Sequence, residues 1–203
     1  MRIGIFGGTF DPPHLGHLIL AAEAQYQLSL DRLLFVLTPD PPHKQDRTLT
    51  PIPSRLAMLE AALADQSAFE LSLVEIDRPG PHYAVDTVAL LKAQYPKDKL
   101  IYLMGGDSLA DLPVNWHRPA EFLAQCDGLG IMRRPHDHID LTTMEKKLPG
   151  LTAKAALVEA PLLEIASRQI RQRVREGRPY RYYLPPRVVQ VIENEGFYIK
   201  VEQ

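Results

Sequence analysis

The sequence contains very little cysteine. Of its 203 residues only Cys126 carries a thiol, so no disulfide can form within the chain. A chain of this length buries about 70% of its unfolded surface and needs neither disulfides nor a structural metal to fold. We expect Cys126 to be a buried apolar residue. A lone thiol also favours a reducing compartment, which predicts a cytoplasmic protein.

Long hydrophobic runs and an excess of either charge are also lacking. No run approaches the roughly 18 residues of a membrane span, and the N-terminal residues lack the apolar core of a signal peptide. The 23 lysines and arginines nearly balance 25 acidic residues, which argues against a general nucleic-acid binder. Seven arginines nevertheless fall between residues 165 and 187. They form either a solvated helix face or a docking site for an anion.

Short apolar runs indicate the fold. Runs of about five residues, too short for helices, predict buried parallel strands at 2–6, 33–37, 100–104, 128–132 and 154–158. Apolar residues at helical spacing predict helices at 15–26, 53–63, 85–95, 119–124, 167–176 and 185–195. This alternation predicts one α/β domain over 1–203, an open and mostly parallel sheet with helices on both faces.

Loop signals separate these elements. Prolines precede His43 and Lys44, which should lie at the carboxyl end of the second strand, on the rim where such sheets bind ligands. The polar stretch 135–151 is irregular at first. We expect it to be an insertion or a partly mobile segment.

The first predicted strand is followed by a segment whose residues suit ligand binding, Gly7-Gly8-Thr9-Phe10-Asp11-Pro12-Pro13-His14-Leu15-Gly16-His17. Paired glycines allow a ligand to approach the backbone, and His14 and His17 should share one face of the first helical turn. Backbone N–H groups and two imidazoles there suit a phosphate. The segment is neither a Walker A loop nor a dinucleotide fingerprint. Two alternatives are a tight turn with ordinary surface histidines and a zinc site whose third ligand comes from afar.

A second anion site is predicted near residues 165–171. Ser167 is expected to cap the helix that follows, and the next N–H groups would then face an anion. Arg171 would add a bidentate cation. The alternative is that Ser167 is only a cap and Arg171 a surface residue.

Both segments resemble signatures of the nucleotidylyltransferase superfamily. The first matches Gly-Gly-Thr-Phe-Asp-Pro-x-His-x-Gly-His at every defined position, and 165–171 resembles Ile-Ser-Ser-Thr-x-Ile-Arg, with Ala166 and Arg168 departing from it. The resemblance implies a Rossmann-like fold of the HxGH type in which residues 165–203 complete an ATP site. It implies contacts with ATP from these two segments through Gly7, Gly8, Thr9, Phe10, His14, His17, Ser167 and Arg171.

Within the superfamily, the chain most resembles the bacterial nicotinate-nucleotide adenylyltransferases. The likeness includes segments 41–44, 81–87 and 105–109 and the following Trp116-His117 pair. It implies that Gly105, Asp107 and Arg133 border ATP, with Asp107 reaching a ribose hydroxyl or the metal. Nicotinate mononucleotide would contact Thr9, Lys44, Tyr83, Ala84, Thr87, Trp116 and His117. Ala84 stands where the family commonly has threonine, which puts discrimination between the nicotinate acid and its amide in question.

The resemblance implies adenylyl transfer from ATP to nicotinate mononucleotide, giving deamido-NAD and pyrophosphate. His14, His17, Lys44 and Arg171 would stabilise the transition state, and Mg²⁺ would be held mainly by the ATP phosphates, with no protein ligand assigned. Alternatives are a phosphopantetheine adenylyltransferase and a non-catalytic nucleotide-binding sensor. The expected partners are small molecules rather than nucleic acid or membrane, and the sequence leaves a homo-oligomer open.

Overall fold

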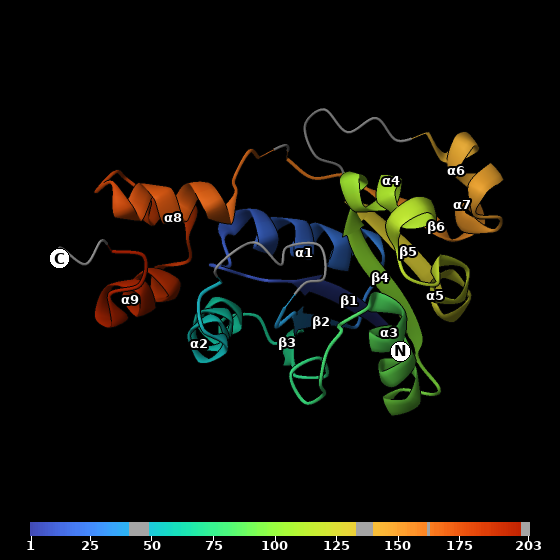
Figure 1. The fold of residues 1–203 in the computed structure, drawn as a ribbon, viewed down its shortest axis with the longest axis horizontal. Coiled ribbons are helices and arrows are strands. Elements are labelled where there is room, and N and C mark those ends of the chain that lie inside the picture. Colours follow the sequence, from blue (N-terminus) through green and yellow to red (C-terminus); the bar gives the residue numbers. More distant parts are fainter. Residues whose placement is uncertain (41–48, 133–139, 162, 200–203) are drawn as a thin grey trace.

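Six strands in the described part of the chain form one parallel sheet with the order β3-β2-β1-β4-β5-β6 (Figure 1). The computed structural model describes residues 1–40, 49–132, 140–161 and 163–199. Every neighbouring pair of strands is parallel. The strands are β1 (Arg2–Gly8), β2 (Arg32–Leu37), β3 (Phe69–Ser72), β4 (Lys99–Gly105), β5 (Gly128–Met132) and β6 (Ala155–Val158).

The strand order reverses between β1 and β4, which lie side by side with Phe6 opposite Leu103. From β1 the chain runs outward to β2 and β3, and from β4 it runs outward to β5 and β6. Open parallel sheets bind ligands at the carboxyl ends of the strands at such a reversal. The first predicted phosphate segment follows β1, and segment 105–109 follows β4, so both lie at this point.

Helices cover both faces of the sheet, as predicted. Alternate β1 side chains point to opposite faces: Ile3 and Ile5 belong to one buried cluster and Phe6 to another. Helices α1 (Leu15–Gln27) and α2 (Ile52–Leu63) pack in the cluster that contains Phe6. The opposite cluster contains side chains from α3 (Ala84–Gln94), α4 (Gly106–Asn115) and α5 (Pro119–Gln125).

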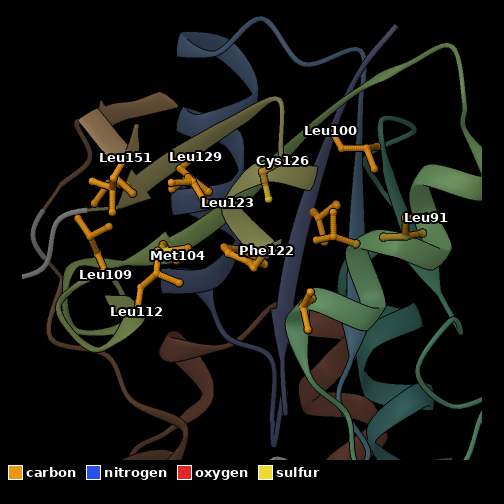
Figure 2. Packing of buried hydrophobic residues seen from close by; sticks show 14 of the residues in the cluster. Leu91, Leu100, Met104, Leu109, Leu112, Phe122, Leu123, Cys126, Leu129 and Leu151 are labelled. Atoms are coloured by element: carbon orange, nitrogen blue, oxygen red, sulfur yellow. The ribbon is translucent and has the colours of Figure 1, made fainter. Parts of the chain in front are cut away.

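The cluster that contains Ile3 and Ile5 also includes Cys126, together with Phe122 and Leu129 (Figure 2). Its thiol belongs to a residue that is 1% exposed, which confirms the expected buried apolar role. Burial raises the pKa of the Cys126 thiol to about 12.

We therefore expect the native protein to react slowly with a thiol reagent at neutral pH, because both the reactive thiolate and access to it are scarce. The measurement is the rate of reaction of Cys126 with a chromogenic disulfide, with urea-unfolded protein as the reference. A native rate equal to the unfolded rate would contradict the burial of this thiol.

The C-terminal part packs against α2 at one end of the molecule (Figure 1). It contains α8 (Ser167–Arg175), a 3₁₀ turn (Arg181–Tyr183) and α9 (Pro186–Glu195). Helix α9 begins with a proline in its first turn and ends at Gly196, whose positive φ of 67° suits glycine. A separate apolar cluster joins Met58 of α2 to Ile170 of α8 and Val188 and Ile192 of α9.

The five predicted strands and six predicted helices are all present, with ends shifted by at most two residues. Five elements of the described ranges were not predicted: β3, α4, α6 (Leu141–Lys147), α7 (Leu151–Lys154) and the 3₁₀ turn Arg181–Tyr183. Residues 140–151, expected to belong to an insertion or a partly mobile segment, contain α6 and α7 and bury Met144, Leu148 and Leu151 in the core. Residues 135–139 lie outside the described residues. No helix in the described ranges is long and apolar enough to cross a membrane.

Candidate active site

The turn between β1 and α1 brings His14 and His17 together. His14 occupies the N-cap position of α1 and His17 the third helical position, and their rings stack with centroids 3.6 Å apart. The prediction that the two imidazoles share one side of the helix start is confirmed, although His14 precedes the first turn rather than belonging to it. Both rings therefore lie beside the backbone N–H groups that open α1.

The orientation of the His17 ring is fixed by two contacts. The backbone N–H of His14 donates to His17 Nδ1 at 3.1 Å, and the Phe10 ring meets the imidazole edge-on at 5.2 Å. An acceptor nitrogen carries no proton, so the neutral ring bears its proton on Nε2. His17 thus carries an N–H group at Nε2, and such a group can donate a hydrogen bond to a phosphate oxygen.

Two features of the turn are needed for this geometry. A Cβ on Gly16 would lie 3.1 Å from His14 Nδ1, so glycine allows the His14 ring to sit against the helix. Phe10 adopts a φ of 45°, a left-handed conformation that is rare for an aromatic residue. Its ring is 2% exposed and packs on Phe6 and Phe35. The predicted contact of Phe10 with ATP can therefore come only from its backbone.

The second predicted segment docks onto the same turn. Ser167 Oγ donates to the Pro12 carbonyl at 2.9 Å, and Arg171 Nη1 donates to the Asp11 carbonyl at 2.5 Å. The prediction that Ser167 caps α8 is wrong: the N-cap position is Ala166, and the Ser167 hydroxyl is used for the contact with Pro12. The N-terminus of α8 and Arg171 are thereby held close to the histidine pair.

A buried arginine that was not predicted from the sequence binds the segments that follow β1 and β2. Arg55 of α2 is 1% exposed and donates to four carbonyl oxygens. Its Nε bonds Thr50 at 2.8 Å, and its Nη atoms bond Thr38 at 2.8 Å, Pro39 at 2.7 Å and Thr9 at 3.3 Å. Burial lowers the pKa of Arg55, and the nearby Asp11 charge opposes that shift. One cation thus fixes the chain after both β1 and β2.

Aromatic side chains flank α3 and α4, with Tyr83 before α3 and Trp116 and His117 after α4. The rings of Tyr83 and His117 stack with centroids 4.2 Å apart, which brings two predicted nicotinate contacts together. Trp116 is partly buried, and its ring lies 5.0 Å from Phe122 and 6.0 Å from Tyr102. Trp116 therefore keeps part of its surface exposed while its other contacts anchor it in the core. An aromatic surface of this kind suits a flat pyridine ring.

Thr87, another predicted contact of nicotinate mononucleotide, uses its hydroxyl in a hydrogen bond within the protein. Thr87 is 1% exposed, and its hydroxyl donates to Glu75 Oε1 at 2.6 Å. Burial raises the pKa of Glu75, while the hydrogen bond from Thr87 lowers it. Arg78 donates to the Pro81 carbonyl at 2.9 Å. The Thr87 hydroxyl, which was expected to contact nicotinate mononucleotide, is therefore engaged with Glu75 and also lies 3.2 Å from the Tyr83 carbonyl oxygen.

The remaining predicted residues fall into two groups. Gly105 is the N-cap of α4, and Asp107 is exposed in the first turn of that helix; Ala84 is the first residue of α3. Lys44 and Arg133 lie outside the described residues.

Known proteins resemble this chain over most of its length. A model of the cytidylyltransferase-like family matches residues 5–173. A probable nicotinate-nucleotide adenylyltransferase of Thermomicrobium roseum is 46% identical, over 99% of this chain and 93% of the relative. The nicotinate-nucleotide adenylyltransferase of Bacillus subtilis is 40% identical, over 97% and 98% of the two chains. The chain belongs to the nicotinate-nucleotide adenylyltransferase family.

The solved structures show the same fold. Nicotinic acid mononucleotide adenylyltransferase of Plasmodium falciparum, complexed with NaAD, superposes with a TM-score of 0.80 at 20% identity, over 97% of each chain. The same enzyme complexed with APC superposes with a TM-score of 0.76. This adenylyltransferase-family chain thus shares its overall fold with proteins of low sequence identity.

One acidic side chain of this family member, that of Asp11, lies in the turn that carries the histidine pair. In the described ranges no three His, Cys, Asp or Glu residues gather at metal-binding spacing. The Asp11 carboxylate next to the histidine pair is hydrogen-bonded to Tyr198 and the Thr50 N–H. Mg²⁺ usually keeps several waters and binds one or two carboxylates together with substrate phosphates. The magnesium ion expected from the sequence stays a prediction, with no protein ligand assigned to it.

Proposed function

We propose that this chain transfers the adenylyl group of ATP to the phosphate of nicotinate mononucleotide, producing deamido-NAD and pyrophosphate in NAD biosynthesis. The observation that carries the proposal is the stacked His14–His17 pair at the start of α1, where the strand order reverses. Arg171 is docked on the same turn. The names of the relatives that match nearly the full chain support the choice of substrates.

The reaction needs alignment and charge stabilisation. A phosphate oxygen of nicotinate mononucleotide attacks the α-phosphorus of ATP, and the bond to the β-phosphate bridging oxygen breaks, so pyrophosphate leaves with that electron pair. The attacking phosphate is already an anion, so we assign no general base and no covalent intermediate. Negative charge builds up on the phosphate oxygens during the reaction. It is stabilised by hydrogen bonds from the N–H groups of α1, His17 Nε2–H and Arg171.

Other groups complete the proposed site. A magnesium ion bound with ATP would supply positive charge that offsets the charge of the phosphates. Lys44 contacts both the triphosphate and nicotinate mononucleotide, and Arg133 and Gly105 border ATP. Asp107 lies at the α4 terminus, where it can reach a ribose hydroxyl or the metal. On the acceptor side, Trp116 and the Tyr83–His117 pair bind the nicotinate ring. The residues 165–203 complete the ATP site, and the protein works in the cytoplasm on small molecules rather than nucleic acid.

The proposal is tested by pyrophosphate release from ATP and magnesium with three separate acceptors: nicotinate mononucleotide, nicotinamide mononucleotide and phosphopantetheine. We expect release with the nicotinate substrate, matched mole for mole by deamido-NAD in the mass spectrum. Release only with phosphopantetheine would overturn the choice of acceptor. ATP binding without release from any acceptor would indicate a nucleotide sensor.

The first position of α3 provides a test of acceptor specificity. We expect Ala84→Thr to raise the preference for nicotinate over nicotinamide mononucleotide by about tenfold, because a hydroxyl can donate to the charged carboxylate but gains less from the neutral amide. The measurement is the ratio of kcat/KM for the two acceptors. Ala89→Thr, on an exposed position of α3, is the matched control. An unchanged ratio in Ala84→Thr would remove this position from carboxylate recognition.

A further inference from the structure

Tyr198, near the C-terminus, reaches the turn that carries the two histidines. Its hydroxyl donates to Asp11 Oδ1 at 2.7 Å, across 187 positions of sequence. The Asp11 side chain is 1% exposed. The hydroxyl also lies 3.6 Å from Met58 Sδ of α2. The C-terminal turn after α9 is thereby tied directly to the loop between β1 and α1.

The other oxygen of Asp11 faces different groups. The backbone N–H of Thr50 donates to Oδ2 at 3.3 Å, and Arg171 Nη1 lies 3.8 Å from the same oxygen. Arg171 makes its short contact, 2.5 Å, with the Asp11 carbonyl instead. The Asp11 backbone carbonyl therefore accepts the hydrogen bond from Arg171. The Asp11 carboxylate lies beyond hydrogen-bond distance of Arg171 Nη1.

The geometry points to Tyr198 as a positioning residue for ATP: its hydrogen bond to Asp11 Oδ1 keeps the Asp11 carboxylate from forming a bidentate pair with Arg171. A guanidinium has five N–H donors, and a bidentate carboxylate pair occupies two of them. With Tyr198 in place, Arg171 retains donors for the triphosphate. This inference rests on the proposed function, because Arg171 contacts ATP in that proposal.

Two further observations support the role of Tyr198. Its φ is 66°, in the left-handed region that bulky residues rarely adopt, and strained backbone tends to occur where the surrounding structure enforces a functional geometry. Burial, together with the Asp11 charge, raises the pKa of the Tyr198 hydroxyl. The hydroxyl accordingly stays protonated, and remains a donor, throughout the neutral pH range.

The test is Tyr198→Phe, which removes the hydroxyl and keeps the ring. We expect the KM for ATP to rise about tenfold, because Asp11 loses a donor at a buried position and recovers it from Arg171. The KM for nicotinate mononucleotide should stay within about twofold, since the contacts proposed for its nicotinate ring flank α3 and α4 and not the turn that carries Asp11. Wild-type pyrophosphate release is measured first, so that failure of the proposed function is recognised separately.

Two variants separate positioning from a general loss of structure. Tyr180→Phe removes a hydrogen bond of similar length, 2.8 Å to Glu193, from the same C-terminal part and should leave both KM values unchanged. Adding Asp11→Asn to Tyr198→Phe removes the charge that captures Arg171, so the KM for ATP should fall back toward the wild-type value. An unchanged KM for ATP in Tyr198→Phe, equal rises for both substrates, or a further rise in the double variant would overturn the proposal.

Discussion

Alanine at position 17 should lower the turnover number by about two to three orders of magnitude, the usual cost of losing one preorganised donor to the transition state. The KM values should change by less than about tenfold, because the donor acts mainly on charge that develops during the reaction. The measurement is steady-state pyrophosphate release by wild type and His17→Ala. A turnover number equal to that of wild type would remove His17 from the mechanism.

A second substitution separates the two ends of the His17 ring. Nδ1 accepts a hydrogen bond from the His14 N–H, and Nε2–H is the donor assigned to phosphate. Asparagine can still accept from the His14 N–H but lacks the reach of Nε2. We therefore expect His17→Asn to lose as much turnover as His17→Ala while its melting temperature stays nearer wild type. Recovery of turnover in His17→Asn would show that His17 acts only by fixing the helix start.

Replacement of Arg55 by methionine should produce the largest change in stability. The substitution leaves four carbonyl oxygens without their donor at a position that is 1% exposed. Loss of a buried, hydrogen-bonded cation costs about 3–5 kcal/mol in free energy of unfolding. For a chain of this size that is a fall in melting temperature of roughly 10–15 °C. Calorimetry or thermal circular dichroism measures it directly.

A surface arginine provides the control for Arg55. Arg187 forms an ion pair with Asp65 at 3.0 Å, and both side chains are mostly exposed. Exposed pairs contribute about 0–1 kcal/mol, so Arg187→Met should shift the melting temperature by only a few degrees. Equal shifts for the two variants would contradict the view that Arg55 supports the loops after β1 and β2. Pyrophosphate release at 20 °C, below unfolding, should fall only for Arg55→Met.

Local patterns were sufficient to predict the centre of the site. His14 and His17 were placed together by helical spacing alone, and the loop after β1 was located by its glycines and by the apolar run before it. Five strands were predicted because buried parallel strands have continuous apolar runs. The strand β3 (Phe69–Ser72) was missed because Glu70 and Ser72 interrupt its apolar pattern at the edge of the sheet. Helix α4 was missed because it contains Pro113.

The supporting polar residues could not be predicted in this way. Arg55 lies on a helix whose sequence shows an ordinary amphipathic pattern, where an arginine is usually exposed. Tyr198 and Asp11 are 187 positions apart, so no local spacing relates them. The capping role of Ser167 was wrongly assigned for the same reason: its hydroxyl bonds to Pro12, which only the folded chain brings near. These contacts depend on tertiary structure, which short-range patterns do not report.

In the proposed reaction, the phosphate of nicotinate mononucleotide attacks the α-phosphorus of ATP directly. The measurement that tests it is the fate of ¹⁸O placed in the phosphate of nicotinate mononucleotide, followed by mass spectrometry of both products. With direct attack, all of the label is retained in deamido-NAD and the released pyrophosphate carries none. Label in the pyrophosphate, or pyrophosphate released without any deamido-NAD, would contradict it.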